Sequence, residues 1–243
     1  MLVLMTDFGP TGPYVGQMQA VLYREAPGVP VVELFNDVPR CNPRAAAYLL
    51  AAYTNEFPPG SVFLAVVDPG VGTAQRRPIM LQADGRWFVG PDNGLFALVA
   101  RRAAACRCWE ITWQPPRLSA SFHGRDLFAP VAARLARGEA PPGREVACLR
   151  QDWPDDLAEV IYLDHFGNAM TGLRAGAVPS DSVIVVAGRQ LPHAVTFGAV
   201  APGAAFWYEN ANGLVELAVN QGSAAQQLGL AIGDHISLVA EHA

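Results

Sequence analysis

The sequence contains no lysine, and all 17 of its basic residues are arginine. A chain without lysine has no P-loop lysine, no Schiff-base lysine and no kinase-type lysine, so each of these chemistries is excluded. A nucleic-acid surface is also disfavoured, because 22 acidic residues outnumber the basic ones and give a net charge of −5. We therefore expect no nucleic-acid partner.

Long apolar runs are missing as well. The longest ones, at residues 61–67 and 183–187, stop far short of the ~20 residues that a membrane-spanning helix needs. The chain leads directly from Met1 into a strand-like run, without the basic n-region or the cleavage site of a signal peptide. We therefore expect a cytoplasmic protein with no membrane partner.

Cysteine is sparse, and its four copies form no CxxC pair. Cys106 and Cys108 are close enough in sequence to share a metal, but no nearby histidine completes a zinc ligand set. The alternative that we favour is scattered buried thiols in a reducing compartment. Gly70 and Gly72 form no dinucleotide fingerprint, because the third glycine and an immediate helix are absent. The sequence thus predicts no metal and no cofactor.

What the chain does have is apolar residues in alternating patterns. Its 243 residues are 51% hydrophobic and 16% charged, which suffices for a sizeable core and for two domains. In the first part we expect strands at 2–6, 29–35 and 61–67, a hairpin around Asp84 and Gly85, and helices at 14–24, 44–55, 94–104 and 125–137. This βαβαβ order predicts an α/β layered domain with a mostly parallel sheet.

The pattern changes after Gly138. Proline-bearing stretches at 139–143 and 152–155 are typical of linkers. Beyond them, six short β-branched segments predict strands at 159–163, 182–186, 194–197, 205–208, 214–219 and 235–239. Such spacing favours a small antiparallel barrel or sandwich. We therefore expect an α/β domain at 1–143, a linker at 144–154 and a β-barrel domain at 155–243.

Polar residues gather where two strands of the first domain end. Asp7 follows the first strand and Asp68 follows the third, each close to glycine. Ligands of open α/β sheets bind beyond the carboxyl ends of the strands, so both carboxylates should face one crevice. A carboxylate there can accept hydrogen bonds from both hydroxyls of a ribose diol. The alternative is that each aspartate only caps the following helix or turn.

A second polar cluster, Phe122 to Asp126, stands just before a predicted helix. His123 in this cluster could position or deprotonate a water, although a lone histidine can equally be structural. Arg76 and Arg77 follow the glycine-rich turn after Asp68, and one of them could turn over the crevice. The alternative for both arginines is a surface position.

Two turn-like segments of the second domain also carry polar groups. In the first, residues 164–168, Asn168 could hydrogen-bond a purine edge and Asp164 could hold an ammonium group. The second, residues 208–213, links two predicted strands. A purely structural turn explains both segments equally well.

Seven motifs taken together resemble one family. They lie in order at 6–9 (Thr-Asp-Phe-Gly), 14–16 (Tyr-Val-Gly), 67–72 (Val-Asp-Pro-Gly-Val-Gly), 91–94 (Pro-Asp-Asn-Gly), 122–126 (Phe-His-Gly-Arg-Asp), 164–168 and 216–230. This set resembles the S-adenosyl-L-methionine (SAM) hydroxide adenosyltransferases, adenosine-forming SAM hydrolases related to the SAM-dependent fluorinase and chlorinase. The resemblance extends from Thr6 to about Ile236 and implies an α/β domain followed by a β-barrel.

The resemblance also implies an activity and an assembly. Family members hydrolyse SAM to adenosine and L-methionine by attack of water-derived hydroxide on ribose C5′, with SAM as substrate and no metal. They are typically homotrimers that hold SAM between the first domain of one subunit and the second domain of its neighbour. The alternatives are a SAM- or purine-nucleoside-binding module without turnover and, less favoured, a SAM halogenase.

The family's functional residues carry over by position. Its water-activating set falls on Asp68, Arg76 and His123, with Arg77 as the alternative arginine because the preceding run is one residue longer here. Ala211 stands where many relatives have a serine that touches the methionine carboxylate. The expected substrate-binding residues are Asp7 (ribose), Tyr14, Phe122, Gly124, Asp164 (ammonium), Asn168 (adenine), Tyr208, Asn210, Ala211, Glu216, and Val219 and Gln221 (backbone to adenine).

Overall fold

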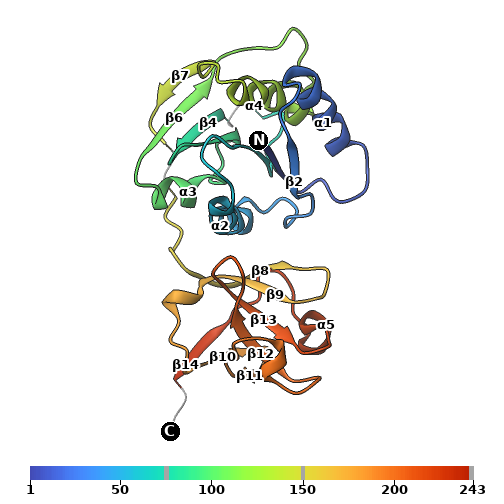
Figure 1. Ribbon diagram of the computed structural model, residues 1–243, viewed down its shortest axis with the longest axis vertical. Helices are drawn as coiled ribbons and strands as arrows, with labels where there is room; N and C mark the ends of the chain where they lie inside the picture. The colour runs from blue at the N-terminus through green and yellow to red at the C-terminus, as the bar shows by residue number, and fades with distance from the viewer. Residues whose placement is uncertain (74–76, 149–150, 241–243) are drawn as a thin grey trace. The chain divides into compact units, whose positions relative to one another are not determined.

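The computed structural model describes residues 1–73, 77–148 and 151–240 (Figure 1). The chain divides into two compact units, Met1–Asp152 and Trp153–Ala243. None of the described helices combines the length and the apolar character that a membrane crossing requires.

The first unit is built on one mixed sheet of seven strands in the order β2-β1-β3-β5-β4-β6-β7. Its strands are β1 (Leu2–Thr6), β2 (Val31–Phe35), β3 (Val62–Val66), β4 (Pro78–Ala83), β5 (Arg86–Pro91), β6 (Cys106–Ile111) and β7 (Gly143–Val146). Strands β1, β2, β3 and β5 pair in parallel, whereas β4 is antiparallel to both β5 and β6. Strand β6 therefore points the same way as β5, and only β4 and β7 run opposite. The expected mostly parallel α/β sheet is confirmed.

Helices cover both faces of this sheet (Figure 1). They are α1 (Tyr14–Glu25), α2 (Pro43–Tyr53) with the 3₁₀ turn η1 (Thr54–Glu56), α3 (Ala97–Arg102), the π-helical turn η2 (Gly124–Phe128) and α4 (Ala129–Ala136). Helix α2 begins where Asn42 accepts a hydrogen bond from the Ala45 amide at 3.0 Å, with Pro43 in the first turn.

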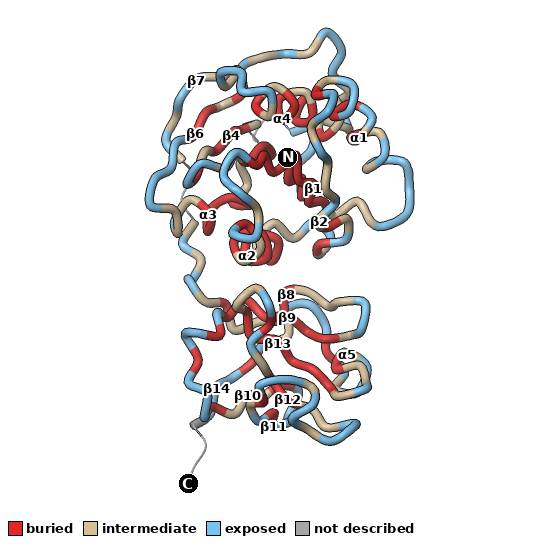
Figure 2. The backbone as a smooth tube through the Cα atoms, viewed as in Figure 1, coloured by how far each residue is buried: buried red, intermediate tan, exposed pale blue. Residues whose placement is uncertain are grey.

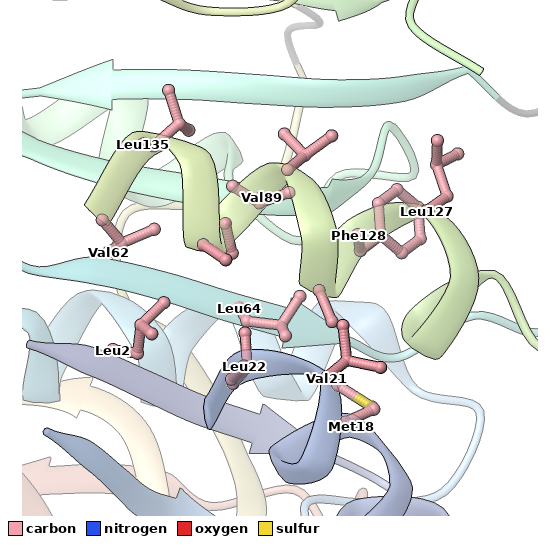
Figure 3. Packing of buried hydrophobic residues seen from close by; sticks show 14 of the residues in the cluster. Leu2, Met18, Val21, Leu22, Val62, Leu64, Val89, Leu127, Phe128 and Leu135 are labelled. Atoms are coloured by element: carbon pink, nitrogen blue, oxygen red, sulfur yellow. The ribbon is translucent and has the colours of Figure 1, made fainter. Parts of the chain in front are cut away.

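Successive side chains of β1 and β3 point to opposite faces of the sheet, so both strands pack against the helices on both sides. Leu2 and Leu64 pack with Met18 of α1 and Phe128 of η2 in one buried cluster (Figure 3). Neighbouring residues of a strand point to opposite faces, so Phe63 projects toward the other layer, where it stacks on Phe88 at 4.9 Å. Both strands are buried along their whole length, as the continuous apolar runs predicted, and Figure 2 shows this for β1.

The second unit holds two antiparallel sheets, in the orders β12-β13-β9-β8 and β11-β10-β14. Its elements are β8 (Leu157–Leu163), β9 (Ala169–Arg174), β10 (Ser182–Val186), β11 (Arg189–Leu191), β12 (Ala205–Glu209), β13 (Leu214–Val219), β14 (Ser237–Ala240), helix α5 (Ala224–Leu228) and the 3₁₀ turns η3 (Ala175–Ala177) and η4 (Phe197–Ala199). The expected antiparallel pairing of short strands is confirmed. Isolated bridges at Glu159–His235 and His193–Trp207 link the edges of the two sheets. Closure into a barrel stays a prediction.

Several predicted elements differ from the structure. The strand expected at 194–197 is wrong: Ala194 donates a single backbone hydrogen bond to Trp207, at 3.0 Å, and Phe197 begins η4. Strands β6, β7, β9 and β11 and helix α5 were not expected. The run β9 (Ala169–Arg174) contains few strand-forming side chains and owes its conformation to pairing with β8 and β13. Strand β7 includes residues 144–146, which we expected in a linker, because they pair with β6.

Candidate functional site

The order of the parallel strands creates a crevice in the first unit. Strand β1 pairs with β2 on one side and with β3 on the other. The connections that leave β1 and β3 therefore diverge at the carboxyl ends of these strands, where open α/β sheets bind their ligands. Asp7 directly follows β1, and Asp68 comes two residues after β3. The topology thus brings together the two carboxylates that the sequence singled out.

A cavity of about 240 Å³ lies at this position, and we call it the strand-end pocket. Six expected site residues line it, and they come from three segments that are far apart in sequence. The six are Asp7, Tyr14, Asp68, Phe122, His123 and Gly124. Phe8, Val66, Val71 and Ser121 complete the lining. The expected Arg76 lies outside the described residues.

Backbone amides hold the two carboxylates in place. Asp7 Oδ2 accepts a hydrogen bond of 2.8 Å from the amide of Cys41, which is in the left-handed region at φ 55°. Asp68 Oδ1 accepts one of 3.1 Å from the amide of Gly70, so the aspartate shapes the turn that it begins. Each carboxylate is therefore oriented before any ligand arrives.

Three aromatic rings form an apolar wall beside these carboxylates. The ring centroids of Phe8, Tyr14 and Phe122 are 5.4 to 6.0 Å apart, at tilted or edge-to-face angles. Gly124 lets the turn η2 approach this wall closely, since an added Cβ would lie 3.2 Å from Sδ of Met18 and 3.4 Å from Phe122. The small residue therefore helps to place His123 at the pocket.

An ion pair stabilises the turn that follows His123. Arg125 donates to Asp126 at 2.6 Å and to Gln17 at 2.8 Å, and its guanidinium lies 5.1 Å from the centroid of Phe122. The hydrogen bond from Arg125 lowers the pKa of Asp126, against an opposing effect of burial, and the Ser119 amide lowers it further. Arg125 and Asp126 thus stabilise the turn beside the pocket without lining it.

Arg77, the alternative to Arg76, is part of another ion pair. Its Nε and Nη2 donate to Asp92 Oδ2 at 3.0 and 2.6 Å. The Asp92 side chain is only 5% exposed, so the pair is largely desolvated on the acidic side. This structural engagement of Arg77 favours Arg76 as the arginine of the crevice, and that assignment stays a prediction.

The second unit has its own polar cavity, of about 700 Å³, which we call the hairpin pocket. Six of the eight residues expected in this unit line it: Asp164, Asn168, Tyr208, Glu216, Val219 and Gln221. Asn210 and Ala211 do not. The Asn210 side chain instead accepts hydrogen bonds from the amides of Asn212 and Leu214 and donates to Glu216, so it shapes the turn and supports the pocket.

Asp164 and Asn168 close the loop between β8 and β9. Asp164 accepts one hydrogen bond from the Asn168 amide at 2.8 Å and another from its side-chain Nδ2 at 2.9 Å. Asn168 is 6% exposed, and its Oδ1 finds no hydrogen-bond partner among the described residues. A buried unpaired acceptor costs about 1–3 kcal/mol, so this oxygen is suited to an N–H donor of a ligand.

Glu216 is the most deeply buried carboxyl of the hairpin pocket. It is 3% exposed and accepts hydrogen bonds from Tyr208 at 2.7 Å and from Asn210 at 2.9 Å. Burial raises its pKa, the two hydrogen bonds oppose part of that shift, and the charge of Asp164 adds to it. Two neighbouring carboxyl groups give the hairpin pocket a preference for a cationic group.

Sequence reasoning missed several lining residues of the hairpin pocket. They are Phe166, Phe197, Gly222 and Ser223. Phe166 is 75% exposed, and its position between Asp164 and Asn168 was the available signal. Gly167 beside it has φ 84°, and an added Cβ would lie 2.0 Å from Oγ of Ser223. The glycine at position 167 therefore allows the β8–β9 loop to lie close to Ser223, the residue before α5.

The fold defines a two-domain α/β protein with a polar pocket at the switch point of its sheet. Residues 2–144 match the N-terminal domain and residues 158–237 the C-terminal domain of the SAM hydroxide adenosyltransferases. The chain belongs to this family.

Known relatives resemble the chain over nearly its full length. An (R)-S-adenosyl-L-methionine hydrolase from Thermus thermophilus is 41% identical, with 97% of this chain and 98% of the relative covered. Another, from Salinispora arenicola, is 40% identical over 97% of this chain and 96% of the relative. The crystal structure of an uncharacterized conserved protein from Thermotoga maritima superposes with a TM-score of 0.90 at 32% identity, covering 98% and 100% of the two chains.

A metal centre would need several ligating side chains close together. The described part of the chain contains no group of three or more His, Cys, Asp or Glu side chains that could hold a metal ion.

Proposed function

We propose that this protein hydrolyses SAM to adenosine and L-methionine by attack of water-derived hydroxide on ribose C5′. The observation that carries the proposal is the strand-end pocket, which brings Asp7, Asp68 and His123 together at the switch point of the sheet. Family membership in both domains and the two hydrolase relatives at 40–41% identity support the same activity.

The chemistry asks little of the protein beyond positioning. The sulfonium sulfur of SAM leaves as a neutral thioether, so no general acid is needed at the leaving group. What remains is to align a water opposite the departing sulfur and to accept its proton. We assign these tasks to Asp68 and His123, with Arg76 as the cation that stabilises the developing hydroxide.

Substrate binding divides between the two pockets. In the strand-end pocket, Asp7 would hold the ribose diol and the aromatic wall would exclude water from the reacting carbon. In the hairpin pocket, Asp164 and the nearby Glu216 suit the methionine ammonium, and Oδ1 of Asn168 suits an N–H of adenine.

We further propose a homotrimer in the cytoplasm, in which the strand-end pocket of one subunit and the hairpin pocket of its neighbour enclose one SAM molecule. The support is that the expected contacts divide between two separate compact units. Dilution below the assembly constant should then abolish turnover together with oligomerisation. A fully active monomer would contradict the shared site.

The decisive experiment is to incubate the purified protein with SAM in ¹⁸O-labelled water. We expect adenosine that carries the label in its 5′-hydroxyl, detected by chromatography and mass spectrometry. A 5′-halo-5′-deoxyadenosine would identify a halogenase instead, and tight binding of SAM without product would identify a binding module. An Asp68→Ala variant, tested in parallel, excludes a contaminating hydrolase if its activity falls far below that of the wild type.

A further inference from the structure

Asp92 and Asn93, the two residues that follow β5, form hydrogen bonds with Val67 and Arg77 on either side of the loop that carries Asp68. Before the loop, Nδ2 of Asn93 donates a hydrogen bond of 2.8 Å to the carbonyl oxygen of Val67. After it, Asp92 binds the guanidinium of Arg77, and the Asp92 amide donates to the Arg77 carbonyl at 2.9 Å. The strand-end pocket is lined by Asp68 but by neither Asp92 nor Asn93, so the two residues act from outside it.

Asn93 contacts the chain just where the regular pairing of β3 with β5 has ended. The ladder between the strands runs from Val62 to Leu64 on β3. Beyond it, Gly90 allows an unusually close approach, because an added Cβ would lie 2.1 Å from the carbonyl oxygen of Ala65. The Asn93 side chain then supplies a contact to Val67 that the backbone of β5 no longer makes.

The same side chain is itself fixed. Oδ1 of Asn93 accepts a hydrogen bond from the Leu95 amide at 3.3 Å. The Asn93 side chain thus joins the turn after β5, through Oδ1, to the peptide unit that precedes Asp68, through Nδ2.

We propose that Asn93 is a positioning residue for the reaction, and that it acts by fixing the peptide before Asp68 so that this carboxylate meets the attacking water. The inference rests on the proposed function. A displacement of about 1 Å in a reacting group can lower a rate about 10²-fold. The hydrogen bond from Asn93 holds the carbonyl oxygen of the peptide that leads into Asp68, next to the turn in which the Gly70 amide donates to Asp68 Oδ1.

The test is Asn93→Asp, which keeps an acceptor for the Leu95 amide and removes the donor to Val67. We expect kcat for SAM hydrolysis to fall roughly 10- to 100-fold, with the Kd for adenosine changed less than about threefold. The matched control is Asn55→Asp, which adds the same charge at an exposed position of η1. Asn93→Ser is the second variant, because it is neutral and too short to reach the Val67 carbonyl.

A double-mutant cycle separates positioning from a general loss of structure. If Asn93 acts through Asp68, Asn93→Asp should have no further effect on kcat in the Asp68→Ala background, measured over long incubations. Equal losses in both backgrounds, or an Asn93→Asp variant as active as the Asn55→Asp control, would overturn the inference. Wild-type protein that forms no adenosine would instead contradict the proposed function, so the two failures are distinguishable.

Discussion

Asn168 donates two hydrogen bonds to Asp164, one from its backbone and one from its side chain, and its side-chain oxygen Oδ1 is buried without a partner among the described residues. The aspartate therefore fixes which atom of the asparagine side chain remains for a ligand. Because Nδ2 is turned toward Asp164, the side-chain atom that stays without a partner among the described residues is Oδ1, an acceptor.

This arrangement predicts a preference for a base with an exocyclic amine. Purine riboside, which lacks the amino group of adenosine, should bind about 5- to 150-fold more weakly, as expected when a buried acceptor is left unpaired at about 1–3 kcal/mol. Isothermal titration calorimetry with both nucleosides measures the difference. Equal affinities would contradict the assignment of Asn168 to the base.

Glu216 predicts a pH dependence of stability. Burial raises its pKa above the usual 4.5, so the folded state binds this proton more tightly than the unfolded state does. Stability from this group is therefore fully present below pH 4.5 and is lost as the pH rises through the raised pKa.

Glu216→Gln removes that titration. Thermal melts from pH 4 to pH 8 should show the variant gaining on the wild type as the pH rises. A constant loss is added because the nitrogen of the new amide cannot accept one of the two hydrogen bonds that Glu216 accepts from Tyr208 and Asn210. A difference in Tm that does not change with pH would show that Glu216 has no raised pKa in the folded protein.

The water-activating residues should affect turnover more than binding. His123→Ala and Arg76→Ala should each lower kcat by roughly 10²–10⁴-fold with a much smaller change in Kd, because these groups stabilise mainly the transition state. Asp7→Ala should instead raise Kd through loss of the ribose contacts. Steady-state kinetics and calorimetry separate the two patterns.

The choice between the two arginines has its own control. Arg77→Lys keeps a cation for Asp92 and should remain close to wild type. If Arg77→Lys is crippled while Arg76→Ala is active, the roles of the two residues are reversed.

Halides should not replace water as the nucleophile. A carboxylate accepts a hydrogen bond from water but repels an anion, and at ~4 Å with an effective dielectric of ~20 the repulsion is about 4 kcal/mol. Arg76 would offset part of it. Incubation of enzyme and SAM in high chloride should yield adenosine and only traces of 5′-chloro-5′-deoxyadenosine. Comparable amounts of the two products would show that Asp68 does not lie beside the attacking nucleophile.

The strand ends were predictable because local chemistry decides them. Continuous apolar runs specified β1 and β3, and the carboxylates that follow had to meet at the carboxyl edge of a parallel sheet. Strand β9 was not predictable, because its conformation depends on partners far away in sequence. The role of Asn210 was missed for a related reason: only the folded turn shows that its side chain points to neighbouring amides and Glu216.

The close contact at Gly90 has a consequence for mutational scanning of this protein. Any side chain at this position would press against the Ala65 carbonyl and force β3 and β5 apart. In a library with every amino acid at position 90, nearly all variants should therefore be inactive. Judged by activity alone, Gly90 would look as essential as Asp68 and His123, although it bears no reactive group. Sorting the library first for soluble expression, and only then for adenosine release, would tell such architectural positions from chemical ones.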